Sequence, residues 1–267
     1  MNLIGDKFLI NDKIVNKEEF LKQYEHSSNN VYEVIRIINS KVLFWEDHFT
    51  RLNNSIIKFI GRSIQINDLF EKIKTVLVEN NIAQGNVKIE ILFHNDQKYT
   101  LFVYPIVFYY PNENDKIIVN TFNIERENPN VKTYNYSFKN KVEKFINENK
   151  LYEVLMVNKD GYITEGSRTN VYFIKDKYFY TAPIDMVLSG VTRLNVNKLI
   201  NKLGYYLVEK SILKSSIYEF DGCFLTSTSS NVLPVDVIDG IEINTRENRY
   251  VRELMVLFQE YLKYKII

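Results

Sequence analysis

The sequence contains little cysteine, little histidine and almost no net charge, and each shortage excludes a class of protein. A single one of its 267 residues is cysteine, Cys223, so neither an intramolecular disulfide nor a cysteine-rich zinc site can form. The three histidines, His26, His48 and His94, lie far apart without the spacing of metal ligands. Lysine and arginine number 34 against 33 acidic residues, which gives no general attraction to nucleic acid. We therefore expect neither a metal centre nor a nucleic-acid partner.

Long hydrophobic runs are absent as well. The longest nearly apolar stretch, Leu101 to Tyr110, contains Pro105 and is far shorter than a membrane span. The N-terminus mixes charged and apolar residues and has no signal-peptide core. Apolar residues make up 45% and charged residues 25%, as in ordinary globular proteins, and the length allows two domains. A cytoplasmic protein without a membrane anchor is expected.

The first half of the chain combines strand and helix patterns. β-branched and aromatic residues around turns predict hairpins at Phe8–Val15 and at Val31–Ile38 with Val42–Trp45. Apolar residues spaced three and four apart predict one helix from Glu46 to Gly61 and another from Asp68 to Asn80. Further strands are expected at Val87–Phe93, Tyr99–Tyr109 and Lys116–Asn123. This grouping is typical of an α+β fold.

A polar, turn-rich segment, Glu125–Tyr134, is expected to link this half to a second domain. Beyond it, periodic apolar residues predict helices at Ser137–Asn149, from Gly190 to Leu203 and at Glu247–Leu262. Short β-rich runs predict strands at Val154–Val157, Asn170–Ile174, Tyr178–Thr181, Tyr205–Glu209 and Gly222–Thr226.

Two polar groups of this second half are candidates for an anion site. Ser189–Arg193 marks a helix start, where unpaired N–H groups and the helix dipole favour an anion. Within it, Gly190 would let a ligand approach the backbone and Thr192 adds a hydroxyl, although an ordinary helix cap by Ser189 explains the same residues. The hydroxyl run Thr226–Ser230 would form a second wall of such a site or, alternatively, a solvated turn.

Three charged residues have a chemical and an ordinary interpretation each. Lys132 would be a nucleophile if buried with a lowered pKa, whereas most lysines are solvated. Glu165 lies in strand-like sequence and is either an exposed edge residue or a buried carboxylate with a cationic partner. Arg51 shares a helix face with His48 and either lies at the surface or reaches a phosphate.

The order of these groups along the chain is more specific than any one of them. It is carried by six segments: Val31-Tyr32-Glu33-Val34-Ile35-Arg36, Glu46-Asp47-His48-Phe49-Thr50-Arg51-Leu52, Lys132-x-x-Asn135, Thr164-Glu165-Gly166-Ser167-x-x-Asn170, Gly190-Val191-Thr192-Arg193, and Thr226-Ser227-Thr228 followed by Pro234-Val235. In these segments, over about residues 31–240, the chain resembles the class IV family of pyridoxal-phosphate enzymes. That family includes D-amino-acid and branched-chain aminotransferases and aminodeoxychorismate lyase.

The resemblance implies a two-domain α+β architecture, that of a fold-type IV enzyme like D-amino-acid aminotransferase. A small N-terminal α/β domain would cover residues 1–123, and a larger β-rich domain that binds the cofactor would cover residues 135–267. The linker, residues 124–134, would carry the Schiff-base lysine. The family further implies a homodimer, with the site at the domain junction and completed by the neighbouring subunit.

The resemblance also implies pyridoxal 5'-phosphate as the cofactor and a role for each matching residue. Lys132 matches the lysine that bonds to the cofactor and then acts as base and acid. Glu165 matches the carboxylate that keeps the pyridine nitrogen protonated. Tyr32 and Arg36 would lie on the substrate side. The phosphate would be held by Arg51, Val191, Thr192, Ser227 and Thr228.

Departures from the family pattern leave the subtype open. Ser28-Asn29-Asn30 stands where relatives commonly have Gly-Asp-Gly, although asparagine tolerates the left-handed backbone of such a turn. Residues 91–99 lack the Arg-x-His pair of the D-amino-acid enzymes, and Tyr32-x-Val34 replaces the Phe-x-Thr frequent in lyases. Arg36 resembles the branched-chain type, but without the glycines usual there.

The leading hypothesis is an aminotransferase that moves an amino group between an amino acid and a 2-oxo acid, with the branched-chain type as one option. The alternative is a lyase on the same scaffold that releases pyruvate. A third class, a relative that binds without catalysing, is disfavoured because Lys132, Glu165 and Arg51 are all retained. No membrane partner is expected.

Overall fold

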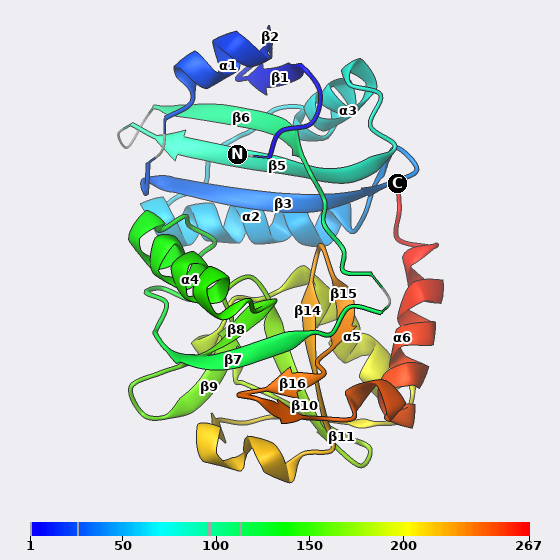
Figure 1. Cartoon of the computed structure of the whole chain (residues 1–267). Helices are drawn as coiled ribbons and strands as arrows, with labels where there is room; N and C mark the ends of the chain where they lie inside the picture. The colour runs from blue at the N-terminus through cyan, green and yellow to red at the C-terminus, as the bar shows by residue number, and fades with distance from the viewer. Residues whose placement is uncertain (1, 26, 95–97, 113) are drawn as a thin grey trace. The chain divides into compact units, whose positions relative to one another are not determined.

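The computed structural model describes residues 2–25, 27–94, 98–112 and 114–267, and the chain divides into two compact units (Figure 1). The N-terminal unit comprises Met1–Tyr109, Val131–Tyr136 and Lys265–Ile267, and the C-terminal unit comprises Tyr110–Asn130 and Ser137–Tyr264. The expected linker, residues 124–134, is therefore divided: its first part belongs to the C-terminal unit and its last four residues to the N-terminal unit. His26 and three residues of the 91–99 segment, Asn95, Asp96 and Gln97, lie outside the described residues.

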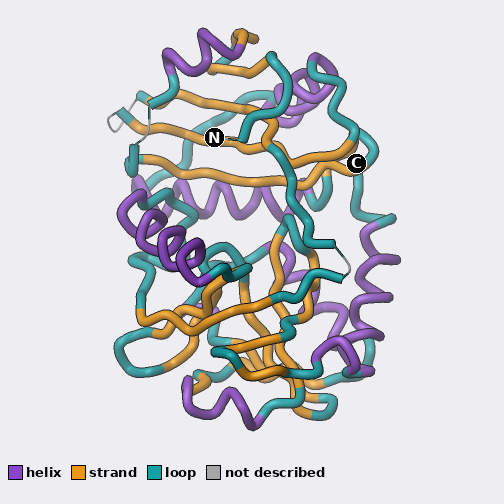
Figure 2. Tube along the Cα trace, viewed as in Figure 1, coloured by secondary structure: helices purple, strands orange, loops and turns teal. Residues whose placement is uncertain are grey.

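The N-terminal unit is built on one antiparallel sheet, whose strands run side by side in Figure 2. The strand order is β2-β1-β6-β5-β3-β4, so β5 and β3, far apart in sequence, are central neighbours. The strands are β1 (Lys7–Ile10), β2 (Lys13–Asn16), β3 (Asn30–Ile38), β4 (Lys41–Val42), β5 (Gln84–Phe93) and β6 (Tyr99–Ile106). The C-terminal residue Ile267 exchanges backbone hydrogen bonds with Val42, which ties the end of the chain to β4.

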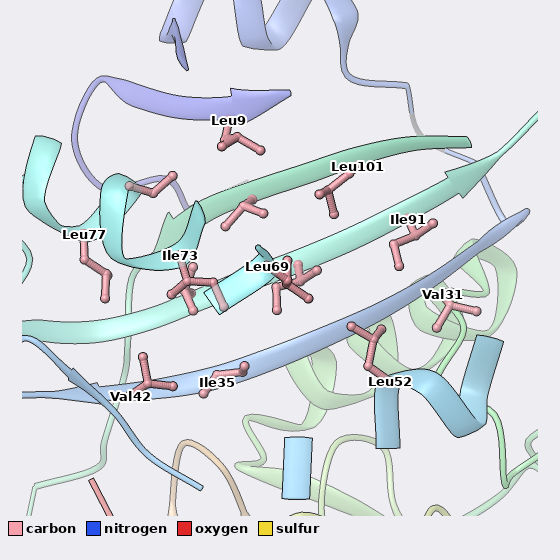
Figure 3. Close-up of a cluster of buried hydrophobic side chains, with 14 of the residues drawn as sticks. Leu9, Val31, Ile35, Val42, Leu52, Leu69, Ile73, Leu77, Ile91 and Leu101 are labelled. Atoms are coloured by element: carbon pink, nitrogen blue, oxygen red, sulfur yellow. The ribbon is translucent and has the colours of Figure 1, made fainter. Parts of the chain in front are cut away.

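One face of this sheet packs against helices α2 (Trp45–Ile60) and α3 (Leu69–Glu79). Alternate residues of the strands point to this face because side chains change sides at every residue of a strand. Figure 3 shows Ile35 and Ile91 of the strands gathered with Leu52 of α2 and Ile73 of α3, all almost fully buried. Burying one such side chain contributes roughly 1.5–3 kcal/mol, so this cluster is the main stabilising core of the unit.

The opposite face carries an aromatic cluster that helix α1 (Lys17–Gln23) partly covers. Phe20 of α1 packs on Phe8, Phe102 and Tyr104, with ring centres 4.8–5.8 Å apart. The sequence prediction missed α1, because Phe20 is its one buried residue and a seven-residue helix shows no apolar period. The signal that was present is the N-cap, Asn16, whose side chain accepts the N–H of Glu19.

The C-terminal unit contains two sheets around a shared apolar core. One sheet has the order β12-β11-β10-β14-β15 and the other β13-β9-β8-β7-β16-β17, with both parallel and antiparallel pairs. Their strands are β7 (Ile118–Asn123), β8 (Glu153–Val157), β9 (Tyr162–Gly166), β10 (Asn170–Lys175), β11 (Tyr178–Thr181), β12 (Tyr206–Glu209), β13 (Ile212–Leu213), β14 (Gly222–Ser227), β15 (Asn231–Pro234), β16 (Val237–Ile238) and β17 (Ile241–Glu242).

Helices complete this unit. Val142 of α4 packs with Val154 and Met156 of β8. The helices are α4 (Tyr136–Asn149), α5 (Val191–Lys202) and α6 (Arg249–Leu262), with short 3-10 turns at Ile184–Met186, Lys214–Glu219 and Thr245–Glu247. The mixture of helices and sheets confirms the α+β prediction.

The prediction of a strand at Val42–Trp45 is wrong about where the strand ends. β4 stops at Val42, Phe44 adopts a left-handed conformation, and α2 already begins at Trp45. The physical reason is the helical period itself, since Trp45, Phe49 and Leu52 are spaced four and three apart and pack on the same core. The predicted end of this helix at Gly61 is confirmed, with Gly61 in the left-handed C-cap conformation.

Two features are absent from the part of the chain that the structure describes. No helix there has the length and apolar character that crossing a membrane requires. No group of three or more His, Cys, Asp or Glu side chains there is placed to hold a metal ion.

Candidate active site

Lys132 is held at the edge of the N-terminal sheet by backbone hydrogen bonds. β4 pairs with β3 only at Ile37 and Ile38, so the beginning of β3 is an edge along which residues 131–134 run. Tyr32 donates its N–H to the carbonyl of Lys132 at 3.0 Å, and Tyr134 donates its N–H to Oδ1 of Asn30 at 3.1 Å. The lysine position is thus determined by hydrogen bonds to β3, one from its main chain and one to the side chain of Asn30.

The side chain of Lys132 lies against an aromatic ring. Its Nζ is 4.7 Å from the ring centre of Tyr32, within the range of a cation–π contact. The N–H of Lys132 donates to Oγ of Ser55 on α2 at 3.3 Å, and the residue is half-buried. The prediction that Lys132 and Tyr32 belong to one site is therefore consistent with their direct contact.

A buried carboxylate, Glu33, lies beside this lysine segment. Glu33 follows Tyr32 on β3 and points to the opposite face, where α2 covers it completely. Nε of Arg51 donates to its Oε2 at 2.8 Å and an Nη of Arg51 to its Oε1 at 2.5 Å, a two-point fork. Nδ1 of His48 lies 3.2 Å from the same Oε1.

This cluster keeps Glu33 ionised and His48 neutral. Burial alone would raise the pKa of Glu33, but the charge of Arg51, with His48, holds that pKa well below its usual range. Burial lowers the pKa of His48, the charges of Arg51 and Lys132 act in the same direction, and Glu33 opposes them. We expect the effect of burial on the pKa of His48 to exceed that of Glu33, because Arg51 already neutralises the carboxylate. His48 therefore stays neutral.

The fork also fixes the direction of the Arg51 guanidinium. His48, Arg51 and Ser55 are spaced three and four apart on α2 and so form one stripe, which reaches both Glu33 and the lysine segment. Arg51 is therefore no surface residue, which excludes its ordinary interpretation: its side chain is only 10% exposed. Contact of Arg51 with a phosphate stays a prediction.

Arg36 lies farther along the same face of β3 as Tyr32 and has other neighbours. Its guanidinium stacks on the ring of Phe108 with 3.1 Å to the ring centre, and it donates to the carbonyl of Gly85 at 3.1 Å. Burial lowers the pKa of Arg36 to about 10. Its assignment to the substrate side stays a prediction.

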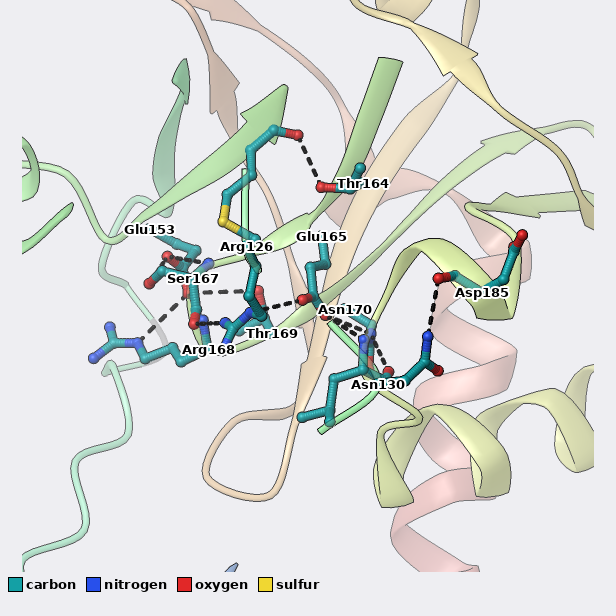
Figure 4. Close-up of polar contacts among 12 residues, drawn as sticks. Arg126, Asn130, Glu153, Thr164, Glu165, Ser167, Arg168, Thr169, Asn170 and Asp185 are labelled. Carbon is teal, nitrogen blue, oxygen red and sulfur yellow. Dashed lines mark hydrogen bonds and ion pairs between the residues drawn. The ribbon is translucent and has the colours of Figure 1, made fainter. Parts of the chain in front are cut away.

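In the C-terminal unit, Glu165 is buried at the end of β9 with a cationic partner (Figure 4). Nε of Arg126 lies 3.1 Å from its Oε1. Oε2 accepts the N–H of Leu188 at 3.0 Å and Nδ2 of Asn170 at 3.3 Å. Of the two interpretations of Glu165, the buried, paired carboxylate is the one observed.

A second buried acid, Glu153 of β8, organises the loop that follows Glu165. Its Oε1 accepts Oγ–H and N–H of Ser167 at 2.6 and 3.1 Å, and its Oε2 accepts the N–H of Arg168 at 3.2 Å. Figure 4 shows these contacts side by side with those of Glu165. The sequence reading missed Glu153, because one acidic residue before an apolar run has no distinguishing pattern.

The N-terminus of α5 is joined to the same network. Its N-cap residue is Gly190 and no side chain caps it, so the ordinary cap by Ser189 is wrong. A side chain at position 190 would overlap Asn170, which gives a packing reason for this glycine, and the approach of a ligand to its backbone stays a prediction. Asn170 also donates to the carbonyl of Leu188 at 3.0 Å and so fixes the turn before Val191 and Thr192.

The hydroxyl run lies in the turn between β14 and β15. Thr226 of β14 pairs with Asn170 of the neighbouring strand β10. The hydroxyl run therefore begins next to Asn170, the hydrogen-bond partner of Glu165. Oγ of Ser227 and Oγ of Ser230 are 2.6 Å apart and close the turn, which leaves Ser227 and Thr228 half-buried. Oγ1 of Thr226 is buried, with no hydrogen-bond partner among the described residues.

Each unit therefore gathers its own share of the predicted residues. In the N-terminal unit, Tyr32, Arg51 and Lys132 come from β3, α2 and the segment on the β3 edge. In the C-terminal unit, Glu165 and the run from Thr226 are connected through Asn170, which also positions the start of α5. The residues that the sequence reading missed are the buried partners of these groups: Glu33, Arg126 and Glu153.

The pKa of His48 makes a testable contribution to stability. The unfolded chain takes up a proton on histidine near pH 6.5, whereas folded His48 resists it, so its stabilisation is present above that pH and is lost below it. The free energy of unfolding of the unchanged protein should fall between pH 7.5 and pH 5.5. In His48→Gln we expect this fall to be smaller by about 1 kcal/mol. Urea denaturation at both pH values measures it.

His94→Gln provides the control for this experiment, because His94 is exposed. Its pH dependence should equal that of the unchanged protein. An identical slope in all three proteins would show that His48 takes up its proton as readily in the folded as in the unfolded chain.

Comparison with known proteins identifies the family of the chain. Residues 30–238 match the family described as amino-transferase class IV. The chain is 26% identical to a D-alanine aminotransferase of Bacillus licheniformis over 90% of both proteins. Its fold matches the branched-chain amino acid aminotransferase of Escherichia coli, with a TM-score of 0.83, 22% identity and coverage of 97% of this chain and 94% of the other.

A putative 4-amino-4-deoxychorismate lyase from Legionella pneumophila has the same fold, with a TM-score of 0.78, 21% identity and coverage of 87% of this chain and 91% of the lyase. The family match favours the transferase reading, and class IV aminotransferases depend on pyridoxal phosphate. The family match spans most of the sequence, from the start of β3 to β16. The chain therefore belongs to the class IV aminotransferases and is an enzyme of that family.

Proposed function

We propose that the chain moves an amino group between an amino acid and a 2-oxo acid with pyridoxal phosphate bound at Lys132. The observation that carries the proposal is the position of Lys132, a half-buried residue whose amine lies against Tyr32 while its backbone is hydrogen-bonded to β3 and α2. The cofactor supplies an aldehyde that accepts the amino group and a ring that takes up electrons from the substrate's α-carbon.

Two features of the C-terminal unit support the fit of a phosphorylated cofactor. The uncapped N-terminus of α5 presents its first N–H groups and a dipole that favour an anion. Oγ1 of Thr226, buried without a hydrogen-bond partner among the described residues, can donate to an additional acceptor. We assign the phosphate to Val191, Thr192, Ser227 and Thr228 together with Arg51.

The charges of the two units suit the remaining roles. We assign Glu165 to the ring nitrogen of the cofactor, where an ionised carboxylate holds a proton on that nitrogen. Arg126 keeps Glu165 charged and in place as a positioning residue. Nζ of Lys132 would then take the proton from the substrate's α-carbon, and Tyr32 would orient this amine. We place the enzyme in the cytoplasm.

Removing the amine of Lys132 should abolish transfer. In the unchanged enzyme, an amino acid alone should convert the bound cofactor to its amine form, which absorbance follows, and borohydride should attach the cofactor to Lys132. We expect Lys132→Ala to lose both and to fall by at least about 10²-fold in turnover. Lys141→Ala, an exposed lysine of α4, should behave as the unchanged enzyme.

Normal turnover by Lys132→Ala would contradict the proposal, as would an adduct on another lysine. The lyase alternative has a distinct signature. A lyase would release pyruvate from its substrate without a second oxo acid, and an amino acid alone would not convert its cofactor.

Glu165→Gln should separate catalysis from cofactor binding. Glutamine keeps the size of the side chain and its contacts with Asn170 and Leu188, but loses the charge that holds the ring proton. We expect full cofactor loading with turnover reduced by about 10²-fold or more, because preorganised charges act mainly on the transition state. Absorbance titration and single-turnover kinetics measure the two quantities. Glu242→Gln, exposed in the same unit, is the control, and equal turnover in both variants would refute the role of Glu165.

We further propose that the active form is a homodimer. The resemblance to the class IV enzymes supports this assembly. Sedimentation velocity of the cofactor-loaded enzyme at assay concentration should give twice the mass of one chain. A stable monomer with full activity would contradict the dimer while leaving the role of Lys132 intact.

A further inference from the structure

One residue of the Gly190-Val191-Thr192-Arg193 segment, Arg193, has no role in the proposed function. Arg193 is the third residue of α5, and its side chain is only 1% exposed. Tyr172 of β10 donates its hydroxyl to the carbonyl of Arg193 at 3.4 Å, so the first turn of α5 lies against β10. The guanidinium is therefore a positive charge enclosed inside the C-terminal unit.

A single nitrogen of this guanidinium makes its hydrogen bonds. Nη2 donates to the carbonyl of Ala182 at 2.8 Å and to Oε1 of Glu209 on β12 at 2.9 Å. The other two nitrogens, Nε and Nη1, are buried and have no hydrogen-bond partner among the described residues. Buried charged groups are ordinarily paired and hydrogen-bonded more completely than this. The contacts of Arg193 inside the unit thus compensate its charge only in part.

The position of Arg193 in the helix is also unfavourable for a cation. Long side chains of a helix lean toward its N-terminus, where the unpaired N–H groups already carry a partial positive charge. The sequence of this turn, Val191-Thr192-Arg193-Leu194, contains no acidic residue that would offset it. The side chain of Glu209 is 37% exposed, so water weakens its compensation of Arg193. The start of α5 therefore carries an excess of positive charge.

We propose that the buried charge of Arg193 stabilises the cofactor phosphate at the start of α5. The proposal rests on the proposed function, which assigns the phosphate to Val191 and Thr192, the residues directly before Arg193. A phosphate group is an anion, and in a protein interior the attraction between opposite charges extends beyond direct contact. Arg193 thus acts on the phosphate from behind the first turn of the helix, without a hydrogen bond to it.

The ordinary alternative is that Arg193 serves only as a structural clamp. Its bond to Ala182 joins the two ends of the segment 182–190, which connects β11 to α5. That segment contains Leu188, whose N–H donates to Glu165. A clamp would support every part of the cofactor that this segment and Glu165 contact, whereas a supporting charge acts on the phosphate alone. The two roles therefore differ in their dependence on the phosphate.

The test compares pyridoxal 5'-phosphate with pyridoxal, which has the same aldehyde and ring but no phosphate. Absorbance titration of the whole chain, freed of bound cofactor, gives the dissociation constant of each. We expect Arg193→Met to weaken binding of pyridoxal 5'-phosphate by about 10-fold or more and to leave that of pyridoxal unchanged. Arg193→Lys should restore most of the affinity, because it keeps the charge and its amine can donate to both acceptors of Nη2.

Glu209→Gln should change the affinity in the opposite direction. Glutamine keeps an oxygen that accepts from Nη2, but it removes the negative charge that partly offsets Arg193. We expect pyridoxal 5'-phosphate to bind about 3-fold more tightly, a modest gain because Glu209 is partly exposed, and pyridoxal to bind as before. A structural clamp predicts unchanged or weaker binding in this variant.

Arg249→Met is the matched control, since Arg249 also lies in the first turn of a helix, α6, but is exposed. It should leave both dissociation constants unchanged. Urea denaturation of each cofactor-free variant shows whether it is folded. If Arg193→Met does not fold, the comparison rests on Arg193→Lys and Glu209→Gln.

Equal weakening of both ligands in Arg193→Met would overturn the role of Arg193. So would the absence of tighter binding of pyridoxal 5'-phosphate in Glu209→Gln, or a 10-fold loss in a folded Arg193→Lys. Borohydride attachment at Lys132 is measured on the unchanged protein. If it is normal while the variants fail to separate the two ligands, this inference fails alone. If the unchanged protein neither binds pyridoxal 5'-phosphate nor attaches it to Lys132, the proposed function fails.

Discussion

The hydrogen bonds between residues 131–134 and the open edge of β3 are the constraint on which the candidate site depends. Lysine side chains are long and flexible, so a lysine in a polar turn would by itself have no defined position. Here the carbonyl of Lys132 accepts from Tyr32 and its N–H donates to Ser55, which fixes the Cα before the side chain is considered. The short length of β4 leaves that edge open, so a local feature of the sheet determines the place of the chemistry.

Buried carboxylates are the second feature that fixes the loops and segments around the site. Glu33, Glu90, Glu153 and Glu165 are all at most 3% exposed, and isolated burial of so many charges would prevent folding. Each is stabilised differently. Glu33 is held by the fork of an arginine, and Glu90 by neutral donors and one lysine. Glu153 is held mainly by backbone N–H groups and a serine, and Glu165 by one arginine nitrogen with two N–H donors. Removing Arg51 from Glu33, or Arg126 from Glu165, would leave a buried charge without its cationic partner, so these pairs hold the surrounding segments in single positions.

Local patterns were sufficient for most elements and for the order of the site segments. The spacing from Phe49 to Ile56 identified α2, and the alternation from Val87 to Phe93 identified β5, because these patterns reflect burial directly. The pairing of β5 with β3 and the division of residues 124–134 between the units depend on contacts between distant segments, which no local pattern encodes. For the same reason Arg126, spaced 39 residues from Glu165, could not be recognised as its partner.

The polar residues of β5 show where the alternation rule fails. Val87, Ile89 and Ile91 occupy the core, so Lys88 and Glu90 would ordinarily face water. Instead Glu90 is 2% exposed and Lys88 lies among tyrosine rings contributed by β3, β6 and the segment after residue 130. A polar position on a strand is solvated only if nothing else covers that face. In this unit that face is covered by the tyrosines at positions 24, 32, 104 and 134. In the sequence they cannot be told from ordinary core aromatics, because only the assembled sheet brings them together. Enclosing a charged pair in this way costs desolvation, and here the hydrogen bonds of Asn30, Tyr24 and Tyr104 to Glu90 offset part of that cost.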